Sequence, residues 1–161
     1  MKRLARHTII ISILAGCGAA LAAGGGELVP LRPDTPTDPV IQGARGKFEA
    51  KDWAGASELL SQAIAGNPQN ADYHNLFAYS MRMGANPPMD LVFRHYNEAL
   101  RIDPRHRGAH EYLGEAYLMQ GNVAKAKEHL AQLDRLCFFG CEEYTMLKKA
   151  VAEYEQQQAK K

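Results

Sequence analysis

The sequence predicts an all-α protein, a solenoid of about three helix–turn–helix repeats closed by a C-terminal capping helix. The main observation is a spacing pattern that recurs along the middle of the chain. It reads Ala56-x3-Leu60-x2-Ala63-x4-Pro68, then Val92-x3-Tyr96-x2-Ala99-x4-Pro104, and in a partial third copy Leu113-Gly114-x2-Tyr117 with Ala126-x3-Leu130. Glycine, asparagine and proline separate these segments, and an amphipathic segment follows the last copy.

The chain begins with the features of a secretory signal peptide. Lys2, Arg3 and Arg6 precede the apolar run 8–15, and no acidic residue occurs before Glu27. The run is too short for a transmembrane helix, which needs about 20 apolar residues. We therefore expect export to an oxidising compartment, the bacterial periplasm.

Two cleavage sites fit this signal peptide. Residues 14–17 (LAGC) resemble a lipobox, which would define a signal of residues 1–16 and leave a lipid-modified Cys17 as the first mature residue. Residues 20–22 (ALA) fit ordinary signal peptidase and would define a signal of residues 1–22. Lipidation would tether the domain to a membrane, and the glycine after the cysteine resembles outer-membrane sorting. The other cut would leave the domain free in the periplasm.

Residues 23–38 are expected to form a flexible linker. The stretch is rich first in glycine and then in proline, ending P-L-R-P-D-T-P-T-D-P. Proline lacks an amide donor and disfavours helix in the residue before it, so this composition is typical of an extended spacer. The alternative is a docking motif for a proline-recognising partner.

The first repeat is predicted over residues 37–70. Helices are expected at 39–50 and 53–65, with a turn at 51–52, and the glycine, asparagine and proline that follow stop the second helix. Trp53 begins this second helix. An aromatic residue at such a turn is more often part of the core than a ligand anchor, so we expect it to pack.

The second repeat is predicted over residues 71–106. Its turn, residues 84–90, is two residues longer than the turn of the first repeat and contains paired prolines. Asp90 is expected to cap a second helix over 91–102. A lengthened turn on one face of a repeat array is either functional or a neutral surface insertion, and the sequence leaves both open.

The third repeat is predicted over residues 107–136 and has the clearest first helix, around 110–117, followed by a second helix over 123–136. Residues 137–161 then form a cysteine-containing turn and a capping helix from Glu142. The apolar stripe of this helix consists of Tyr144, Leu147, Val151 and Tyr154. A solenoid needs such a half-polar helix to cover its last exposed face.

These repeats resemble the tetratricopeptide repeat (TPR) family, over about two-thirds of the chain. The segments NPPMDLVFRHYNEALRIDPRHRGAHEYLGEAYL and LCFFGCEEYTMLKKA are also similar to a group of small exported TPR proteins of Proteobacteria. The resemblance implies a superhelix whose first helices line a concave groove. The implied groove-facing residues are Arg45, Asn75, Tyr79, Arg82, Glu111 and Glu115, with Met83 and Met119 at the margin. The two-lysine carboxylate clamp of some chaperone-binding TPR domains is missing, since Arg45 and Arg82 are the only groove cations.

Cys137 and Cys141 are separated by three residues. This spacing differs from the C-x2-C of thioredoxin-like sites, and no second pair completes a four-ligand zinc site. A disulfide across a turn, with Gly140 supplying backbone freedom, is the simplest interpretation. Free or partner-linked thiols are the alternative.

The histidines raise the question of a metal site. His106 and His110 are four residues apart, with Glu111 and Glu115 nearby and His129 further along. The third repeat starts at about residue 107, which leaves His106 in the preceding loop. His110 occupies the position that His74 holds one repeat earlier, and repetition favours packing over ligation. We therefore predict no metal site.

Composition and motifs together favour binding over catalysis. The formal net charge is +1, so no basic field points to nucleic acid. No phosphate loop, nucleophile elbow or HExxH motif occurs. We expect a non-enzymatic module of the bacterial cell envelope, without cofactor, that holds a peptide or protein in its groove. The alternatives are a metal or redox accessory protein using His106, His110, Cys137 and Cys141, and a structural protein that self-associates as a homo-oligomer.

Overall fold

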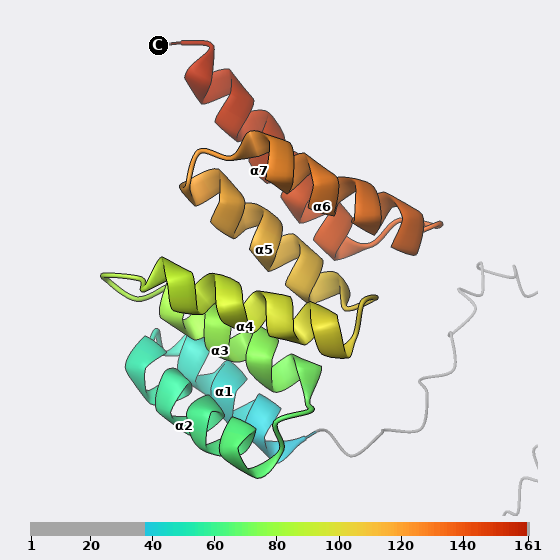
Figure 1. Cartoon of the computed structure of the whole chain (residues 1–161). Coiled ribbons are helices and arrows are strands. Elements are labelled where there is room, and N and C mark those ends of the chain that lie inside the picture. The colour runs from blue at the N-terminus through green and yellow to red at the C-terminus, as the bar shows by residue number, and fades with distance from the viewer. Residues whose placement is uncertain (1–37, 161) are drawn as a thin grey trace, which may run out of the picture. The chain divides into compact units, whose positions relative to one another are not determined.

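The computed structural model describes residues 38–160, which contain seven helices and no strand (Figure 1). The helices are α1 (Pro39–Glu49), α2 (Trp53–Gly66), α3 (Ala71–Arg82), α4 (Met89–Ile102), α5 (Arg107–Met119), α6 (Val123–Leu136) and α7 (Glu142–Gln158). No helix in this range is both long and apolar enough to span a bilayer. The expected signal peptide, Cys17 and residues 23–37 of the expected linker lie outside the described residues.

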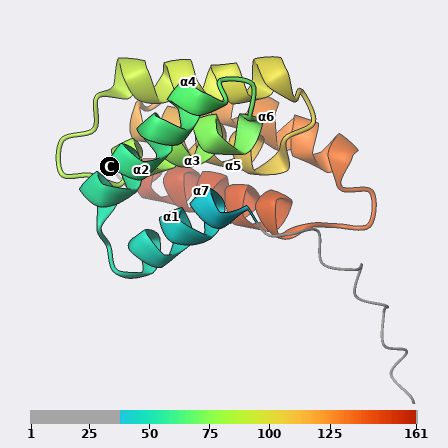
Figure 2. The same cartoon turned by 90° about the horizontal axis from the view of Figure 1, so that it is seen from below.

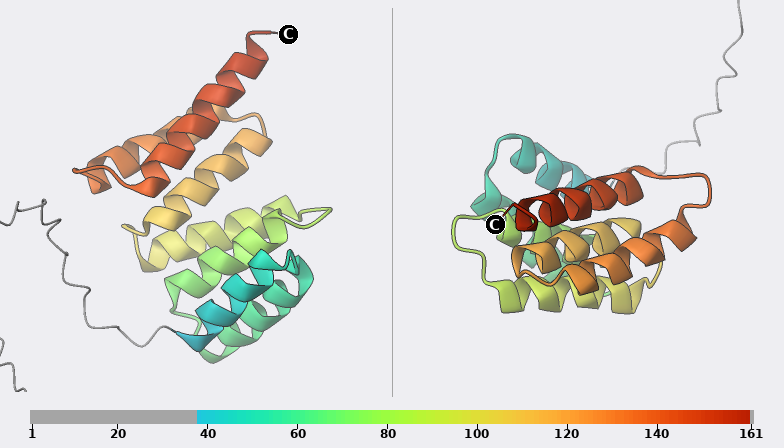
Figure 3. Two further views of the ribbon diagram at one scale, coloured as in Figure 1. Left: turned by 180° about the vertical axis from the view of Figure 1, so that it is seen from behind. Right: turned by 90° about the horizontal axis from the view of Figure 1, so that it is seen from above.

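The helices stack as pairs, α1 with α2, α3 with α4 and α5 with α6, and α7 packs against both α5 and α6. The first helices of the pairs also contact one another along the stack: α1 meets α3, α3 meets α5, and α5 meets α7. Viewed along the stack, α1 and α7 lie toward one side and α4 toward the other (Figures 2 and 3). The first helices and α7 therefore form one continuous row.

The recurring sequence pattern forms the core of this stack. Alanines at its small positions let neighbouring helices approach closely, and Ala56, Ala99 and Ala126 are completely buried. Leu60 and Tyr96 occupy its large positions and are also fully buried. Burying a large apolar side chain stabilises a fold by about 1.5–3 kcal/mol. The residues that revealed the repeat are therefore the residues that hold it together.

Polar side chains fix where most helices begin. Asp52 Oδ1 accepts the Gly55 amide at 2.9 Å at the start of α2. Asn70 and Asn122 cap α3 and α6 in the same way, at 3.2 and 3.1 Å. Each cap satisfies a backbone amide that has no partner within the helix.

The start of α4 differs from the prediction, because Asp90 does not cap it. The helix begins at Met89, with Pro88 as its N-cap and no side-chain cap hydrogen bond. The Pro88 carbonyl accepts two amides of the first turn, at 2.9 and 3.0 Å. Proline has no amide of its own to satisfy, so the helix can start directly after it. Asp90 lies inside the first turn, where the helix dipole favours its charge.

A short turn with two cysteines connects α6 to α7. Cys137 and Cys141 are joined by a disulfide, and Gly140 between them adopts a φ of 85°. Glycine takes this left-handed conformation without steric penalty. Phe138 and Phe139 form the tip of the turn and are almost fully exposed.

The last helix closes the stack with the apolar stripe that the sequence predicted. Leu147 and Val151 are buried, and Tyr144 and Tyr154 pack beside them. A methyl group added at Gly114 of α5 would lie 2.6 Å from Leu147 Cδ2. The close approach of α5 and α7 therefore requires glycine at this position.

Candidate functional site

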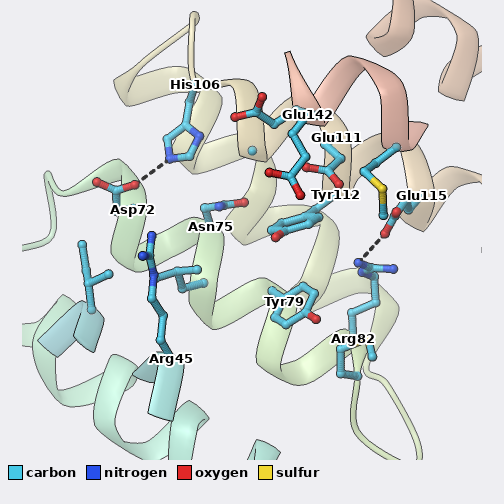
Figure 4. Close-up of a pocket in the computed structure, with 16 residues that line it drawn as sticks. Arg45, Asp72, Asn75, Tyr79, Arg82, His106, Glu111, Tyr112, Glu115 and Glu142 are labelled. Carbon is cyan, nitrogen blue, oxygen red and sulfur yellow. Dashed lines mark hydrogen bonds and ion pairs between the residues drawn. The ribbon is translucent and has the colours of Figure 1, made fainter. Parts of the chain in front are cut away.

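A groove of about 720 Å³ follows the row formed by α1, α3, α5 and the first turns of α7 (Figure 4). Its lining includes all six residues that the sequence placed at groove-facing positions: Arg45, Asn75, Tyr79, Arg82, Glu111 and Glu115. Met83 also lines it. Met119 lies outside the lining but places its sulfur 3.9 Å from Arg82 Nη1.

Two matching helical stripes form the floor of the groove. The stripe on α3 consists of Asp72, Asn75, Leu76 and Tyr79, and the stripe on α5 consists of Gly108, Glu111, Tyr112 and Glu115. Steps of three, one and three residues keep each stripe on one helix face. Every member of the second stripe lies 36 residues after its counterpart in the first. The groove is therefore a repeated surface with different chemistry at each repeat.

Arg82 is built into the floor and is not a free cation. Its side chain is only 7% exposed, and its Nη2 donates to Glu115 Oε2 at 2.7 Å. Its Nε donates to the hydroxyl of Tyr96 at 3.2 Å. Burial alone would lower the pKa of Arg82, but Tyr96 and Glu115 raise it above its ordinary value. Arg45 remains as the exposed arginine of the groove.

Aromatic rings support the middle of the floor. Tyr79 and Tyr112 lie with ring centroids 4.8 Å apart, and the Arg82 guanidinium lies 5.5 and 5.7 Å from these two centroids. Phe48 and Trp53 pack against Tyr79 in edge-to-face geometry, with ring centroids 5.1 and 6.0 Å away. Trp53 therefore packs within the fold, as expected from the sequence.

The end of the groove between α5 and α7 is acidic. Glu111 and Glu115 of α5 line it together with Glu142 and Glu143 of α7. Burial, followed by the neighbouring Glu115, Glu143 and Glu142, raises the pKa of Glu111 to about 8. Figure 4 shows the Glu111 and Glu142 carboxyl groups facing the groove from these two helices.

Asn75 presents an unsatisfied acceptor beside this acidic end. The residue is 4% exposed, and its Oδ1 is the one buried side-chain polar atom in the range 38–160 without a hydrogen-bond partner. In Figure 4 the amide points from α3 into the space between α3 and α5. Buried acceptors of this kind are rare, because each costs free energy until a donor reaches it.

His106 belongs to the groove, whereas His110 does not. His106 Nδ1 accepts the Ala109 amide as the N-cap of α5, which leaves its Nε2–H facing Asp72 Oδ1 at 3.1 Å. His110 lies behind the groove, with its Nδ1 3.0 Å from His129 Nδ1. Both rings therefore use their nitrogens in hydrogen bonds within the fold.

The cysteine turn offers no thiolate to a metal ion. Between residues 38 and 160, three ligand-type side chains approach closely enough to share an ion only at Cys137, Cys141 and Glu143. The sulfur atoms of Cys137 and Cys141 are bonded to each other. A disulfide sulfur lacks the charge that makes thiolate a strong ligand.

The sequence did not reveal several lining residues. Tyr112 and Asp72 could have been found by extending the helical spacing from Glu111 and Asn75, since both lie on the same stripes. Nothing in the sequence indicated that Glu142 and Glu143 line the groove. Acidic residues are common in the first turn of a helix, because the helix dipole stabilises their charge there. Their place in the groove depends on how α7 packs against α5.

The sequence matches no protein-family model and no curated protein. Solved structures resemble it in fold. The translocator chaperone SycD of Yersinia enterocolitica, in complex with a peptide of the translocator YopD, has a TM-score of 0.61 at 12% identity, over 74% of this chain and 92% of that chain. The TPR2B domain of yeast Sti1, in a complex with pHsp70, has 0.64 at 19% identity, over 73% and 94%. The TPR protein TTC0263 of Thermus thermophilus has 0.62 at 20% identity, over 77% and 67%.

These likenesses establish the architecture. Residues 38–160 adopt the all-α solenoid of TPR proteins, which confirms the predicted fold class. At such low identities the comparison concerns the fold alone.

Proposed function

We propose that this protein is a non-catalytic interaction module that holds an extended segment of a protein partner in its groove. The groove is the observation that carries this proposal, because it crosses four helices and presents apolar, aromatic, amide and charged side chains in succession. An extended chain offers one side chain to such a surface about every 6.6 Å, since alternate residues point to the same side. A repeated surface suits a chain better than a compact small molecule.

Similar folds support the same proposal. The SycD and Sti1 structures are both complexes, one with a YopD peptide and one with pHsp70. Repeat proteins of this architecture use their concave faces as extended binding surfaces. We infer that the concave face of this chain has the corresponding role, with a partner of its own.

We also propose that the module works in the bacterial cell envelope, on the basis of the basic and apolar N-terminal segment. The intact mass of the exported protein tests this. A tri-acylated chain beginning at Cys17, lost on Cys17→Ser, would identify a membrane-tethered module. An unmodified chain beginning at Ala23 would identify a free periplasmic one, and a full-length chain confined to the cytoplasm would refute export.

Binding through the groove is tested by capture of partners from an envelope fraction with the full chain. The groove variant is Arg45→Ala with Leu76→Ser, two lining residues with little role in the core. Its matched control is Arg94→Ala with Ile64→Ser, which removes the same side-chain types away from the groove. We expect the groove variant to lose at least about tenfold in affinity, which corresponds to about 1.4 kcal/mol, and the control to bind like the parent. Equal binding by all three proteins, with unchanged circular dichroism, would refute the groove as the binding site.

A further inference from the structure

The charged groups of the groove are unevenly paired. Two of its acidic side chains have ion-pair partners, Glu115 with Arg82 and Glu143 with Arg107, and a third, Asp72, accepts a hydrogen bond from His106. Two others, Glu111 and Glu142, have no ion-pair partner among the described residues. Both lie at the end of the groove where α7 meets α5. This end therefore holds carboxyl groups without a compensating cation.

Glu111 is the more unusual of the two because it is buried. It is 8% exposed and has neither an ion pair nor a side-chain hydrogen bond within residues 38–160. A carboxyl group that is partly desolvated and lacks an opposite charge or hydrogen-bond donors favours its neutral form. The raised pKa of Glu111, about 8, is the expected consequence. A cation that entered the groove would supply the missing partner.

Asn75 independently indicates that a donor is missing in the same groove. Its unpartnered Oδ1 is buried between α3 and α5, and residue 75 is the counterpart of residue 111 one repeat earlier. An amide oxygen only accepts hydrogen bonds. A ligand group rich in N–H donors would satisfy the acceptors of both side chains.

We propose that Glu111, together with Asn75 and Glu142, receives the side chain of a lysine or arginine of the bound segment. This inference rests on the proposed function and adds a charge preference to it. Ammonium and guanidinium groups carry several N–H donors and form charge-assisted hydrogen bonds with carboxylates. The apolar part of either side chain would lie along the floor beside Tyr112.

A metal ion suits this place less well. In the part of the chain that the structure describes, no three acidic residues of the groove bring a carboxylate oxygen each within 4.8 Å of one another, as ligands of one ion would. An acidic ligand is also disfavoured, because it would meet Glu111, Glu142 and their neighbours. Arg45 lies near the opposite end of the groove and would bind an acidic side chain further along the partner's segment.

A synthetic peptide library tests the preference directly. The probe is a positional-scanning library of N-acetylated, C-amidated decapeptides, so that neither terminus supplies a charge, and the receptor is the full exported chain. We expect pools with lysine or arginine fixed at one position to bind about tenfold more tightly than pools with norleucine or glutamate there, because only the cationic side chains form charge-assisted hydrogen bonds with the carboxylates; tenfold corresponds to about 1.4 kcal/mol.

Matched variants assign the preference to its residues. Glu111→Gln keeps the size of the side chain and removes its charge, and should reduce the tenfold preference to about twofold. Glu142→Gln, at an exposed position, should reduce it partly and guards against a folding defect in the first variant. Glu49→Gln on the exposed side of α1 is the control and should leave the preference unchanged.

Proton linkage provides a second readout. A cation paired with Glu111 requires that carboxyl to be ionised, so affinity for the best lysine pool should rise about tenfold between pH 7 and pH 9 and stay flat in Glu111→Gln. The groups that face Glu111 are Glu115 on α5, Glu142 and Glu143 on α7, and Arg82 on α3.

The outcomes separate this inference from the proposed function. Binding that is lost in the Arg45→Ala, Leu76→Ser variant but shows no preference for basic residues would overturn the lysine or arginine assignment and leave the interaction module standing. A basic preference that persists in Glu111→Gln would also overturn the assignment. No groove-dependent binding by any pool would overturn both.

Discussion

Arg82 connects three helices beneath the groove. It extends from α3 to Tyr96 of α4 and to Glu115 of α5, and it lies against the rings of Tyr79 and Tyr112. A residue that resembles a ligand-binding cation in the sequence therefore stabilises the surface on which a ligand would lie.

Replacing Arg82 should destabilise the fold before it affects binding. Arg82→Ala would leave Glu115 and the buried hydroxyl of Tyr96 unpaired, and we expect a loss of about 2–4 kcal/mol in the free energy of unfolding. Urea denaturation followed by circular dichroism measures it. The exposed Arg94→Ala should stay within about 0.5 kcal/mol of the parent. A loss that small for Arg82→Ala would contradict the structural role.

Four histidines form two equivalent pairs behind the groove. His74 and His95 face each other through their Nδ1 atoms at 2.8 Å, and His110 and His129 do so at 3.0 Å. In each pair Nε2 of the α3 or α5 histidine lies against a proline carbonyl and donates to it, and the two Nδ1 atoms have room for one proton between them. The contact therefore cannot persist when both facing Nδ1 atoms of a pair carry a proton.

This requirement predicts acid sensitivity. Burial, followed by the charge of the neighbouring histidine, lowers the pKa of His95 and of His129 to about 4. The folded protein then binds fewer protons than the unfolded chain, whose histidines titrate near 6.5, so the contribution to stability is complete above pH 6.5 and disappears as pH falls through about 4. Between pH 7 and pH 5 we expect a loss on the order of 1–3 kcal/mol after allowance for partial exposure.

Urea denaturation at the two pH values measures this loss. The double variant His95→Gln, His129→Gln removes the titrating groups and should show a smaller difference between pH 7 and pH 5 than the parent. Equal differences in the two proteins would mean that carboxylates, not the histidine pairs, cause the acid sensitivity.

At the scale of elements, the sequence predicted helices best where turn residues mark both ends. The helix expected at 123–136 is observed over those residues, because Asn122 caps it and the cysteine turn follows it. The start of α4 was two residues wrong, since Asp90 resembles a cap while the Pro88 carbonyl performs that role. Backbone capping leaves no trace in the sequence.

The contact between α5 and α7 depends on one glycine. Gly114→Ala would place a methyl group against the fully buried Leu147, and we expect a loss of about 1–3 kcal/mol with faster amide exchange in α7. Gly46→Ala is the control, because its methyl group would meet nothing within 4 Å and should stabilise α1 by about 0.5–1 kcal/mol. Equal effects at the two positions would contradict the close packing of α7.

At the scale of the whole molecule, periodicity predicted more than individual motifs did. The repeat pattern located the core, and the family resemblance that it carried implied which residues face the groove. It did not show that Arg82 is buried or that α7 adds two carboxylates, because both depend on packing between elements distant in sequence. The repeat boundaries at residues 70 and 106, the signal peptide and the anchor at Cys17 stay predictions.

The central claim is that a protein segment lies in the groove, and photo-crosslinking from single positions tests it most directly. A photoreactive phenylalanine derivative would be placed at Leu76 inside the groove and, in a second protein, at Ile64 outside it. After illumination of intact cells, we expect a discrete crosslinked partner from position 76 and none from position 64, with the crosslink removed by Arg45→Ala. The same partner crosslinked from position 64 but not from position 76 would contradict the claim.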